Sequence, residues 1–223
     1  MTRKILVATV ALLLCLWPLY AAATPTPEAV ISKVQTLYDK AGGFQARFLQ
    51  DSLIKAAGAS DSAAGWVYFK RPCRMRWQYE TPPEQKKEIV SDGRLVWMYV
   101  PDDATVMVYK LDKVLRSDLV MRFFSGIGLV KSDFTISWRR PPQPGANYII
   151  DLFPKKEQPE LKRLTLTINP DTYLVEKLDF TNALGEESRF TFTQIKLGVP
   201  FGPSFFTFTP PEGVQVIRQT PGS

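Results

Sequence analysis

The feature that most limits the fold of this chain is a series of short runs in which hydrophobic and polar residues alternate. In the first run, Met75, Trp77 and Tyr79 alternate with charged or amide side chains. The apolar members of the later runs are Leu95, Trp97 and Tyr99, then Leu164, Leu166 and Ile168, then Leu178 and Phe180, and finally Phe190 and Phe192. Turn-forming residues lie between runs at 91–93, 169–171 and 182–185. Because side chains of a strand point alternately to its two faces, these runs predict an antiparallel meander with one apolar face.

Two helical segments accompany the predicted strands. The first spans 27–41: Thr26 can cap it, Pro27 is at its first position, and Gly42-Gly43 end it. Its hydrophobic residues fall at helical spacing on one face: Val30, Val34, Leu37, Tyr38 and Ala41. The second begins near Ser117-Asp118 and ends at Gly126, with an apolar stripe of Leu115, Leu119, Val120, Phe123 and Phe124. A sheet of this length must curl to cover its apolar face, so we expect the helices to cover the opening.

The N-terminal 23 residues have the pattern of a cleavable secretory signal. Arg3 and Lys4 precede an uncharged apolar run over 5–17, and Ala21-Ala22-Ala23 supplies the small residues that precede a cleavage site before Thr24. The run is shorter than the about 20 residues that a membrane-spanning helix needs. We therefore expect a signal peptide at 1–23 and a single domain at 24–223 that works outside the cytoplasm.

The residues after the leader exclude several kinds of site. Two of the 28 basic residues and none of the 22 acidic ones lie in the leader, so residues 24–223 carry a net charge of +4. These scattered charges do not favour a nucleic-acid partner. The chain has no histidine, and Cys73 is the one cysteine after the leader. Histidine-activated nucleophiles and histidine or cysteine metal sites are thereby excluded, and an enzyme would have to use carboxylates, lysine or tyrosine.

Four stretches, taken together and in order, resemble the outer-membrane lipoprotein carrier family, LolA. Residues 44–50 resemble the family's F-x-A-x-F-x-Q opening, and 65–77 resemble its G-x-aromatic-K-R-P and R-W hairpin. Residues 91–99 resemble its S-D-G…W-x-Y hairpin, and 206–214 resemble its closing F-x-F-x-P-P-x-G-V. Each stretch alone is weak, but their order behind a signal peptide makes the resemblance strong.

The resemblance implies both a fold and an activity. The implied fold is an unclosed antiparallel β-barrel, or half-barrel, in which helices form a lid over an apolar cavity. The implied activity is that of a periplasmic chaperone, not an enzyme, that takes acylated lipoproteins released by an inner-membrane ABC transporter and carries them to an outer-membrane receptor. We expect a monomer that needs no cofactor and no metal.

Arg71 is the most informative single residue. On the predicted strand that ends there, it shares a face with Val67 and Phe69. A guanidinium on an apolar face needs acceptors, which carbonyls at the end of a lid helix would supply. The resemblance implies that Arg71 is such a lid latch, bonded to the lid backbone. The alternative is that Arg71, directly before Pro72, reaches solvent.

We expect the acyl chains to bind to apolar side chains from the strands and from the second helix. The predicted acyl-chain-binding residues are Val67, Phe69, Met75, Trp77, Leu95, Trp97, Tyr99, Leu119, Phe123 and Phe124. The alternative is that the aromatic residues Trp77, Trp97, Tyr99, Phe123 and Phe124 are ordinary core. Trp66 and Tyr68 fall on the strand face opposite Arg71 and are predicted to be structural.

Two other functions remain open at this stage. The outer-membrane receptor of the same pathway would share the fold but is itself acylated on a cysteine. Leu13-Leu14-Cys15 is a poor match to the small residues that lipoprotein processing requires. A carboxylate-based periplasmic hydrolase, with Glu88 and Asp92 as candidate acids, is the alternative from a different class.

Overall fold

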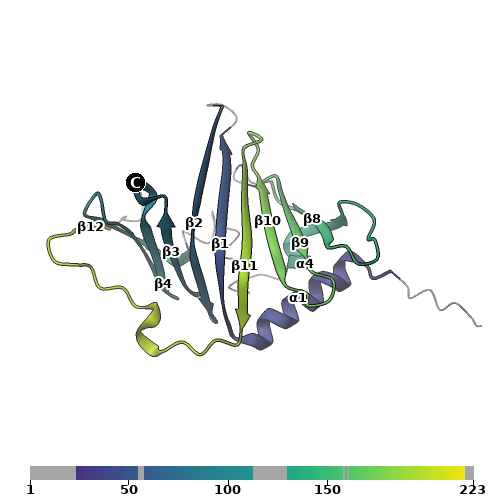
Figure 1. The fold of residues 1–223 in the computed structure, drawn as a ribbon, viewed down its shortest axis with the longest axis horizontal. Helices are drawn as coiled ribbons and strands as arrows, with labels where there is room; N and C mark the ends of the chain where they lie inside the picture. The colour runs from purple at the N-terminus through teal and green to yellow at the C-terminus, as the bar shows by residue number, and fades with distance from the viewer. Residues whose placement is uncertain (1–23, 55–57, 113–129, 158, 160, 219–223) are drawn as a thin grey trace, which may run out of the picture.

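The computed structural model describes residues 24–54, 58–112, 130–157, 159 and 161–218 (Figure 1). They form a mainly β structure built around one long sheet. The helical elements are α1 (Pro27–Ala41), α4 (Val130–Asp133) and the 3-10 turns η2 (Pro83–Gln85) and η3 (Pro203–Phe206). The strands are β1 (Gly43–Ile54), β2 (Ala59–Lys70), β3 (Arg74–Thr81), β4 (Lys87–Asp92), β5 (Leu95–Val100), β6 (Thr105–Lys110), β7 (Phe134–Trp138), β8 (Tyr148–Pro154), β9 (Arg163–Ile168), β10 (Val175–Thr181), β11 (Glu187–Leu197) and β12 (Gln215–Arg218).

The sheet is open, and its strand order is β12-β6-β5-β4-β3-β2-β1-β11-β10-β9-β8-β7. Neighbouring strands are antiparallel except for β12, which pairs in parallel with β6. The long strand β1 lies between β2 and β11 and so joins the two halves of the sheet. Since β12 and β7 are the two ends of this order, the sheet does not close into a barrel. The predicted unclosed, mainly antiparallel fold is confirmed.

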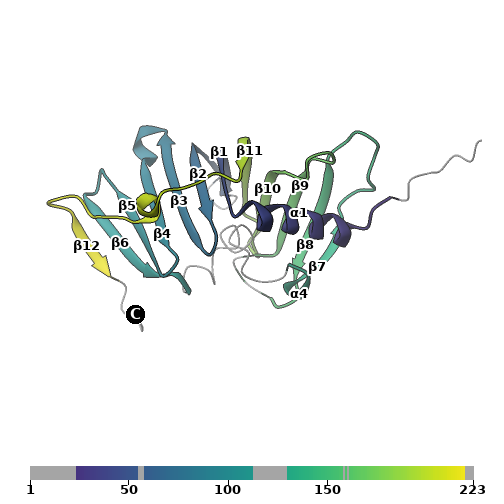
Figure 2. The same ribbon diagram turned by 90° about the horizontal axis from the view of Figure 1, so that it is seen from below.

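Helix α1 has the predicted boundaries because its caps are local. The Ala29 amide donates a hydrogen bond to Thr26 Oγ1 at 3.2 Å, and Gly42 ends the helix with a φ of 68°. The helix buries Val30, Ile31 and Val34 and lies along the half of the sheet that contains β7–β10 (Figure 2). We call the side of the sheet that faces α1 the inner face and the opposite side the outer face.

The inner face carries most of the hydrophobic core. Strand register places alternate residues of β1, β2 and β3 on it: Phe44 is opposite Phe69, Val67 is opposite Trp77, and all four are buried. In the other half, the register aligns Phe190, Leu178, Leu166 and Ile150 across four strands. On these strands every second side chain therefore faces the core, as the alternation in the sequence predicts.

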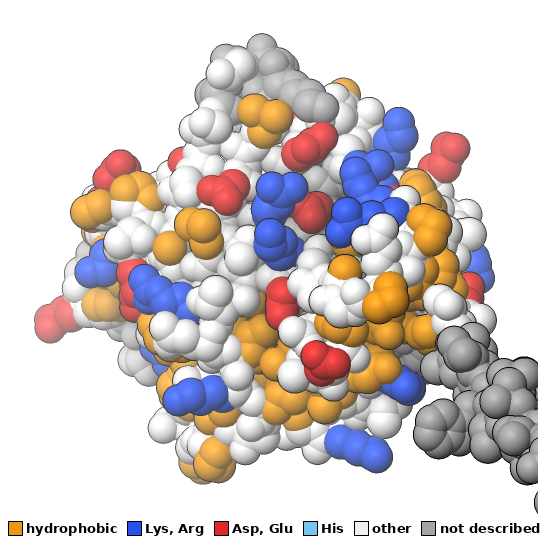
Figure 3. Space-filling view, turned by 45° about the vertical axis from the view of Figure 1, so that its right-hand side comes forward, with side chains coloured by type: hydrophobic (Ala, Val, Ile, Leu, Met, Phe, Trp, Pro, Cys, Tyr) orange, Lys and Arg blue, Asp and Glu red, His pale blue; other side chains and the backbone are white. Residues whose placement is uncertain are grey.

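The outer face is covered partly by ion pairs and partly by the chain itself. Arg47 Nη1 lies 2.7 Å from Glu80 Oε2, and its guanidinium lies over the Trp66 ring. Arg189 pairs with Asp179 on the neighbouring strand. Side chains of both charges are interspersed on the face shown in Figure 3, while hydrophobic side chains gather in its lower half. The prediction that Trp66 lies opposite the apolar face is confirmed.

A C-terminal segment, residues 199–214, crosses the outer face of β2–β5 before the chain enters β12 (Figure 2). Phe206 is buried, the Phe205 ring lies 5.0 Å from that of Tyr68, and Arg76 Nη1 donates to the Phe205 carbonyl at 2.8 Å. This segment contains the closing sequence motif. Neither its path nor the parallel strand β12 is predicted by the sequence.

The leader at 1–23 and the predicted helix at 117–126 lie outside the described residues. Within the described ranges, no helix combines the length and the apolar character that crossing a bilayer requires.

Candidate functional site

The centre of the inner face is a cluster of aromatic rings from β1, β3 and β11. Phe48 lies 5.1 Å from Trp77 and 4.9 Å from Tyr79, and Trp77 lies 5.6 Å from Phe190, in edge-to-face contacts. Phe69 extends the cluster from β2, 5.9 Å from Trp77. These rings come from strands on both sides of β1, so the cluster spans the junction of the two half-sheets and forms a continuous apolar surface.

The structure brings four of the predicted acyl-chain-binding residues together on this surface. Val67 and Phe69 come from β2, Met75 and Trp77 from β3, and each is no more than 5% exposed. They are cross-strand neighbours: Val67 pairs with Trp77, and Phe69 pairs with Met75. Leu119, Phe123 and Phe124 lie outside the described residues, so their predicted position stays a prediction.

The structure places the other three predicted residues elsewhere. Register aligns Trp77 with Ile89 and then Met98, so Met98 faces inward while Leu95, Trp97 and Tyr99 face outward. The Tyr99 ring lies 5.7 Å from Phe208 of the C-terminal segment. The expectation that these three share the inner face is wrong. Strand β5 is apolar on both faces because the C-terminal segment covers its outer side, so alternation could not identify the inward set.

Arg71 lies where the end of β2 meets the end of α1. Its amide donates to the carbonyl of Gly42, the residue that caps α1, at 2.9 Å. Its guanidinium Nη1 lies 2.6 Å from Asp39 Oδ1, one turn back along the same helix. The side chains are 33% and 51% exposed, so the pair is partly solvated. Arg71 is thus bonded to a helix terminus, as predicted, but not in the predicted way. Its side chain pairs with the Asp39 carboxylate, and the Gly42 carbonyl accepts from the Arg71 main-chain amide.

The opposite end of the inner face is polar. The Tyr79 hydroxyl donates to Gln50 Oε1 at 2.9 Å, and Gln50 Nε2 donates to Ser52 Oγ at 3.2 Å. Ser52 Oγ is in turn 3.1 Å from Ser188 Oγ. Lys87 Nζ lies 4.3 Å from the centre of the Tyr79 ring, and burial lowers the pKa of Lys87. We call these five residues the polar row.

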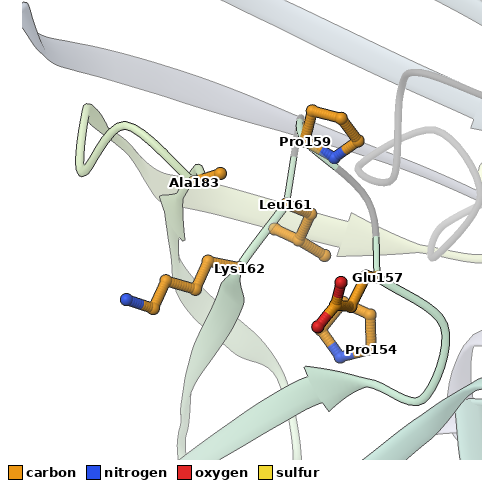
Figure 4. A pocket seen from close by; sticks show the side chains of 6 residues that line it. All are labelled: Pro154, Glu157, Pro159, Leu161, Lys162 and Ala183. Carbon is orange, nitrogen blue, oxygen red and sulfur yellow. The ribbon is translucent and has the colours of Figure 1, made fainter.

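Three pockets among the described residues open at this same end of the sheet. One, of about 400 Å³, lies beside the polar row; it is lined by Gln78, Tyr79, Glu80, Lys86, Lys87, Glu88, Tyr99 and Pro101. A second, of about 320 Å³, is lined in part by Ser52 and Ser188 of the polar row. The third, of about 650 Å³, lies in the other half of the sheet beside the β8–β9 loop (Figure 4). Leu161, Pro154 and Pro159 make its wall apolar, while the Lys162 side chain extends away from Leu161 (Figure 4).

The carboxylates named as candidate acids have structural partners. Glu88 Oε1 accepts from Arg76 Nε at 2.6 Å and from Gln78 Nε2 at 3.1 Å. Asp92 Oδ1 accepts from the amides of Arg94 and Leu95 and so closes the β4–β5 turn. Among the described residues, no cluster of histidine, cysteine or acidic side chains could hold a metal ion.

Sequence reasoning missed several contributors to the site. Phe48 and Phe190 are central to the aromatic cluster, but neither was predicted to contact acyl chains. Phe190 was placed in an alternating apolar run, and Phe48 lies in a run that could have been found in the same way. Asp39 carried no signal, because nothing local indicates that a helical carboxylate will meet a residue 32 positions later (Asp39 to Arg71).

Comparison with known proteins assigns the chain to a family. The family model described as "Outer membrane lipoprotein carrier protein LolA" matches residues 39–209. The chain is 30% identical over 218 residues to an outer-membrane lipoprotein carrier protein of Nitrosomonas europaea, covering 98% of this chain and 100% of the relative. It is 29% identical to one of Methylococcus capsulatus, covering 92% and 94%.

A solved structure of an uncharacterized conserved protein from Thermus thermophilus has a similar fold, with a TM-score of 0.56 at 11% identity, covering 84% of this chain and 98% of that one. The fold alone does not define a family at this identity. The family is defined by the family match over most of the chain and by the full-length likeness to the Nitrosomonas relative. The chain belongs to the outer membrane lipoprotein carrier protein LolA family.

Proposed function

We propose that this protein is a periplasmic chaperone that binds the acyl chains of lipoproteins released from the inner membrane. It would receive them from an ABC transporter and deliver them to an outer-membrane receptor. The observation that carries the proposal is the continuous aromatic and aliphatic inner face of the unclosed sheet, against which helix α1 packs.

The binding energy for such a cargo comes from removing methylene groups from water. Each buried CH₂ contributes about 0.8 kcal/mol, so even part of one acyl chain gives substantial affinity. The inner face offers contacts of the right kind in Val67, Phe69, Met75 and Trp77. Met75 is flexible and can adapt to chains of different shape.

Release of the cargo requires that helix α1, which covers part of the inner face, can move at a low cost in free energy. The Arg71–Asp39 pair joins the end of β2 to α1, and both side chains are partly solvated. Ion pairs of this kind contribute about 0–1 kcal/mol, so cargo entry can displace the pair. Arg71 would then act as the latch of the cover, with Asp39 as its partner.

The decisive experiment is purification from the periplasm, with bound material identified by mass spectrometry. The expected result is a mature chain that begins near Thr24, is not acylated, and carries one or more diacylated or triacylated lipoproteins. A mature chain that itself begins with an acylated cysteine would instead identify the outer-membrane receptor of the pathway.

A reconstituted transfer assay tests the second half of the proposal. The loaded protein should pass its lipoprotein to receptor-containing outer-membrane vesicles and not to vesicles without receptor. Recovery of the protein without lipoprotein, together with failure to accept it from inner-membrane vesicles, would contradict a carrier function.

A further inference from the structure

The inner face changes character along its length. Along β1 it runs through Phe44, Ala46 and Phe48, which are at most 3% exposed, and then to Gln50 and Ser52. On β11 the same change occurs between Phe190 and Ser188. One end of the apolar surface is therefore closed by the α1–Arg71 junction, and the other end is bordered by the polar row.

The polar row takes its residues from four strands, and the bond from Tyr79 to Gln50 passes over β2, which lies between β3 and β1. It runs from Lys87 on β4 through Tyr79 on β3 and Gln50 and Ser52 on β1 to Ser188 on β11, through the contacts already given. Tyr79 is buried and the other four residues are half-buried, so the row forms the polar border of the apolar surface and not part of its buried core. Donors remain for a ligand oxygen: Gln50 Nε2 has a second N–H, and the contact between Ser52 and Ser188 uses only one of the two serine hydroxyls as donor.

Lys87 is the strongest donor of the row. Among the described residues, its ammonium lies over the Tyr79 ring and has Asp61 as the nearby opposite charge, and Asp61 is itself bonded by Gln85 Nε2. Lys87 is partly buried and stands at the rim of the 400 Å³ pocket. An ammonium in this position has donors available for a ligand oxygen, in surroundings where a hydrogen bond is worth more than in water.

We propose that the polar row binds the ester carbonyl oxygens of the diacylglyceryl group of the cargo, with Lys87 as the main donor. The inference rests on the proposed carrier function. The acyl chains then extend from Gln50 toward Phe44 along the inner face, a path of about 20 Å over six extended residues. The polypeptide of the cargo leaves the carrier at the Lys87 end of the sheet, away from Arg71.

Binding of two probes tests the role of Lys87. One is a synthetic diacylglyceryl-cysteine lipopeptide with no net charge, and the other is a fluorescent alkyl chain without carbonyl groups. Lys87→Met removes the ammonium but keeps an apolar stem, and Lys87→Arg is the matched control. We expect Lys87→Met to weaken lipopeptide binding about tenfold, as loss of one charged hydrogen bond implies, with alkyl-chain binding unchanged and Lys87→Arg within about twofold of the parent.

Equal loss of both probes in Lys87→Met, or no loss of either, overturns the assignment while leaving the carrier function intact. If the parent protein binds neither probe, the carrier function itself fails, and the inference with it. The two failures are therefore distinguishable.

The exit direction has its own test. A photo-crosslinking side chain placed at Lys86 stands beside the polar row, and one at Arg94 stands at the other end of β4; both positions are exposed. In the loaded protein, the crosslinker at 86 should capture the cargo polypeptide and the one at 94 should not. Capture at 94 instead of 86 would overturn the proposed orientation.

Discussion

Arg71 Nη1 and Asp39 Oδ1 lie 2.6 Å apart and join the end of β2 to the last turn of α1. The main-chain bond from Arg71 to Gly42 lies directly beside this pair. The main-chain bond fixes the position of the junction, whereas the partly solvated ion pair can exchange. A covering helix can thus be held in place and still loosen when cargo enters.

Arg71→Leu should weaken the movement of helix α1 in response to cargo, or trap lipoprotein on the carrier. Asp39→Asn should have a similar effect, because it removes the same ion pair while keeping the helix. Stability should change by less than about 1 kcal/mol in either variant, since the pair is partly exposed. A reconstituted transfer assay measures loading and delivery, and urea denaturation measures stability.

The double variant distinguishes the ion pair from other effects. If the pair carries the latch, Arg71→Leu combined with Asp39→Asn should lower delivery no further than either single change. Unchanged loading and delivery in Arg71→Leu would count against the latch altogether.

The elements that the sequence predicted are those determined by local rules. Helix α1 has its predicted ends because its N-cap Thr26 and its C-cap Gly42 directly adjoin the helix in the sequence. Val67, Phe69, Met75 and Trp77 lie on one face because neighbouring strands of a hairpin must keep their alternation in register, and their contact with acyl chains stays a prediction.

The features that the sequence did not predict depend on contacts between distant residues. Leu95, Trp97 and Tyr99 were assigned to the wrong face because β5 is apolar on both sides, and the cover on its outer side comes from residues more than a hundred positions later, such as Phe208. The polar row likewise combines residues of four strands, each of them unremarkable within its own segment.

Gly65→Ala should strongly destabilise the protein. A Cβ at position 65 would lie 1.8 Å from the carbonyl oxygen of Gln78 and 3.1 Å from Phe48 Cε1. Strand β3 would have to move, which costs about 1–3 kcal/mol or more. Gly202→Ala is the control, since nothing lies within 4 Å of its Cβ position. Equal urea midpoints for the two variants would show that β2 and β3 separate at little cost.

Phe48→Ala should lower the free energy of unfolding by about 3–5 kcal/mol, because it removes a ring from the centre of the aromatic cluster. Leu184→Ala is the matched surface control, since Leu184 is 82% exposed; its free energy of unfolding should stay within about 0.5 kcal/mol of the parent. Denaturant titration followed by tryptophan fluorescence provides the measurement. A change of less than about 1 kcal/mol in Phe48→Ala would mean that the cluster is loosely packed.

Phe123→Glu and Phe124→Glu should each abolish lipoprotein loading if the predicted second helix forms a wall of the acyl-chain site. A carboxylate on that wall would have to be desolvated by the acyl chains. Loading from inner-membrane vesicles is the measurement, with Phe123→Leu as the control that keeps the surface apolar. Loading that survives both glutamate changes would remove this segment from the site.

The stability of the protein should fall steeply in alkali because of Tyr38. Burial of its hydroxyl, which accepts a hydrogen bond from the Val175 amide at 3.2 Å, raises the pKa of Tyr38 from 10.0 to about 12. The unfolded chain releases this proton near pH 10, whereas the folded protein keeps it to about pH 12, so the folded state is favoured below pH 10 and loses roughly 3 kcal/mol between those values. Tyr38→Phe removes the titrating group and costs about 1 kcal/mol at neutral pH through the lost acceptor. Urea titrations at pH 8, 10 and 11.5 measure the free energy of unfolding of the parent and of Tyr38→Phe. The parent should be the more stable protein at pH 8, and this difference should shrink and then change sign as the pH rises. A difference that does not change with pH would show that the Tyr38 hydroxyl is accessible to water.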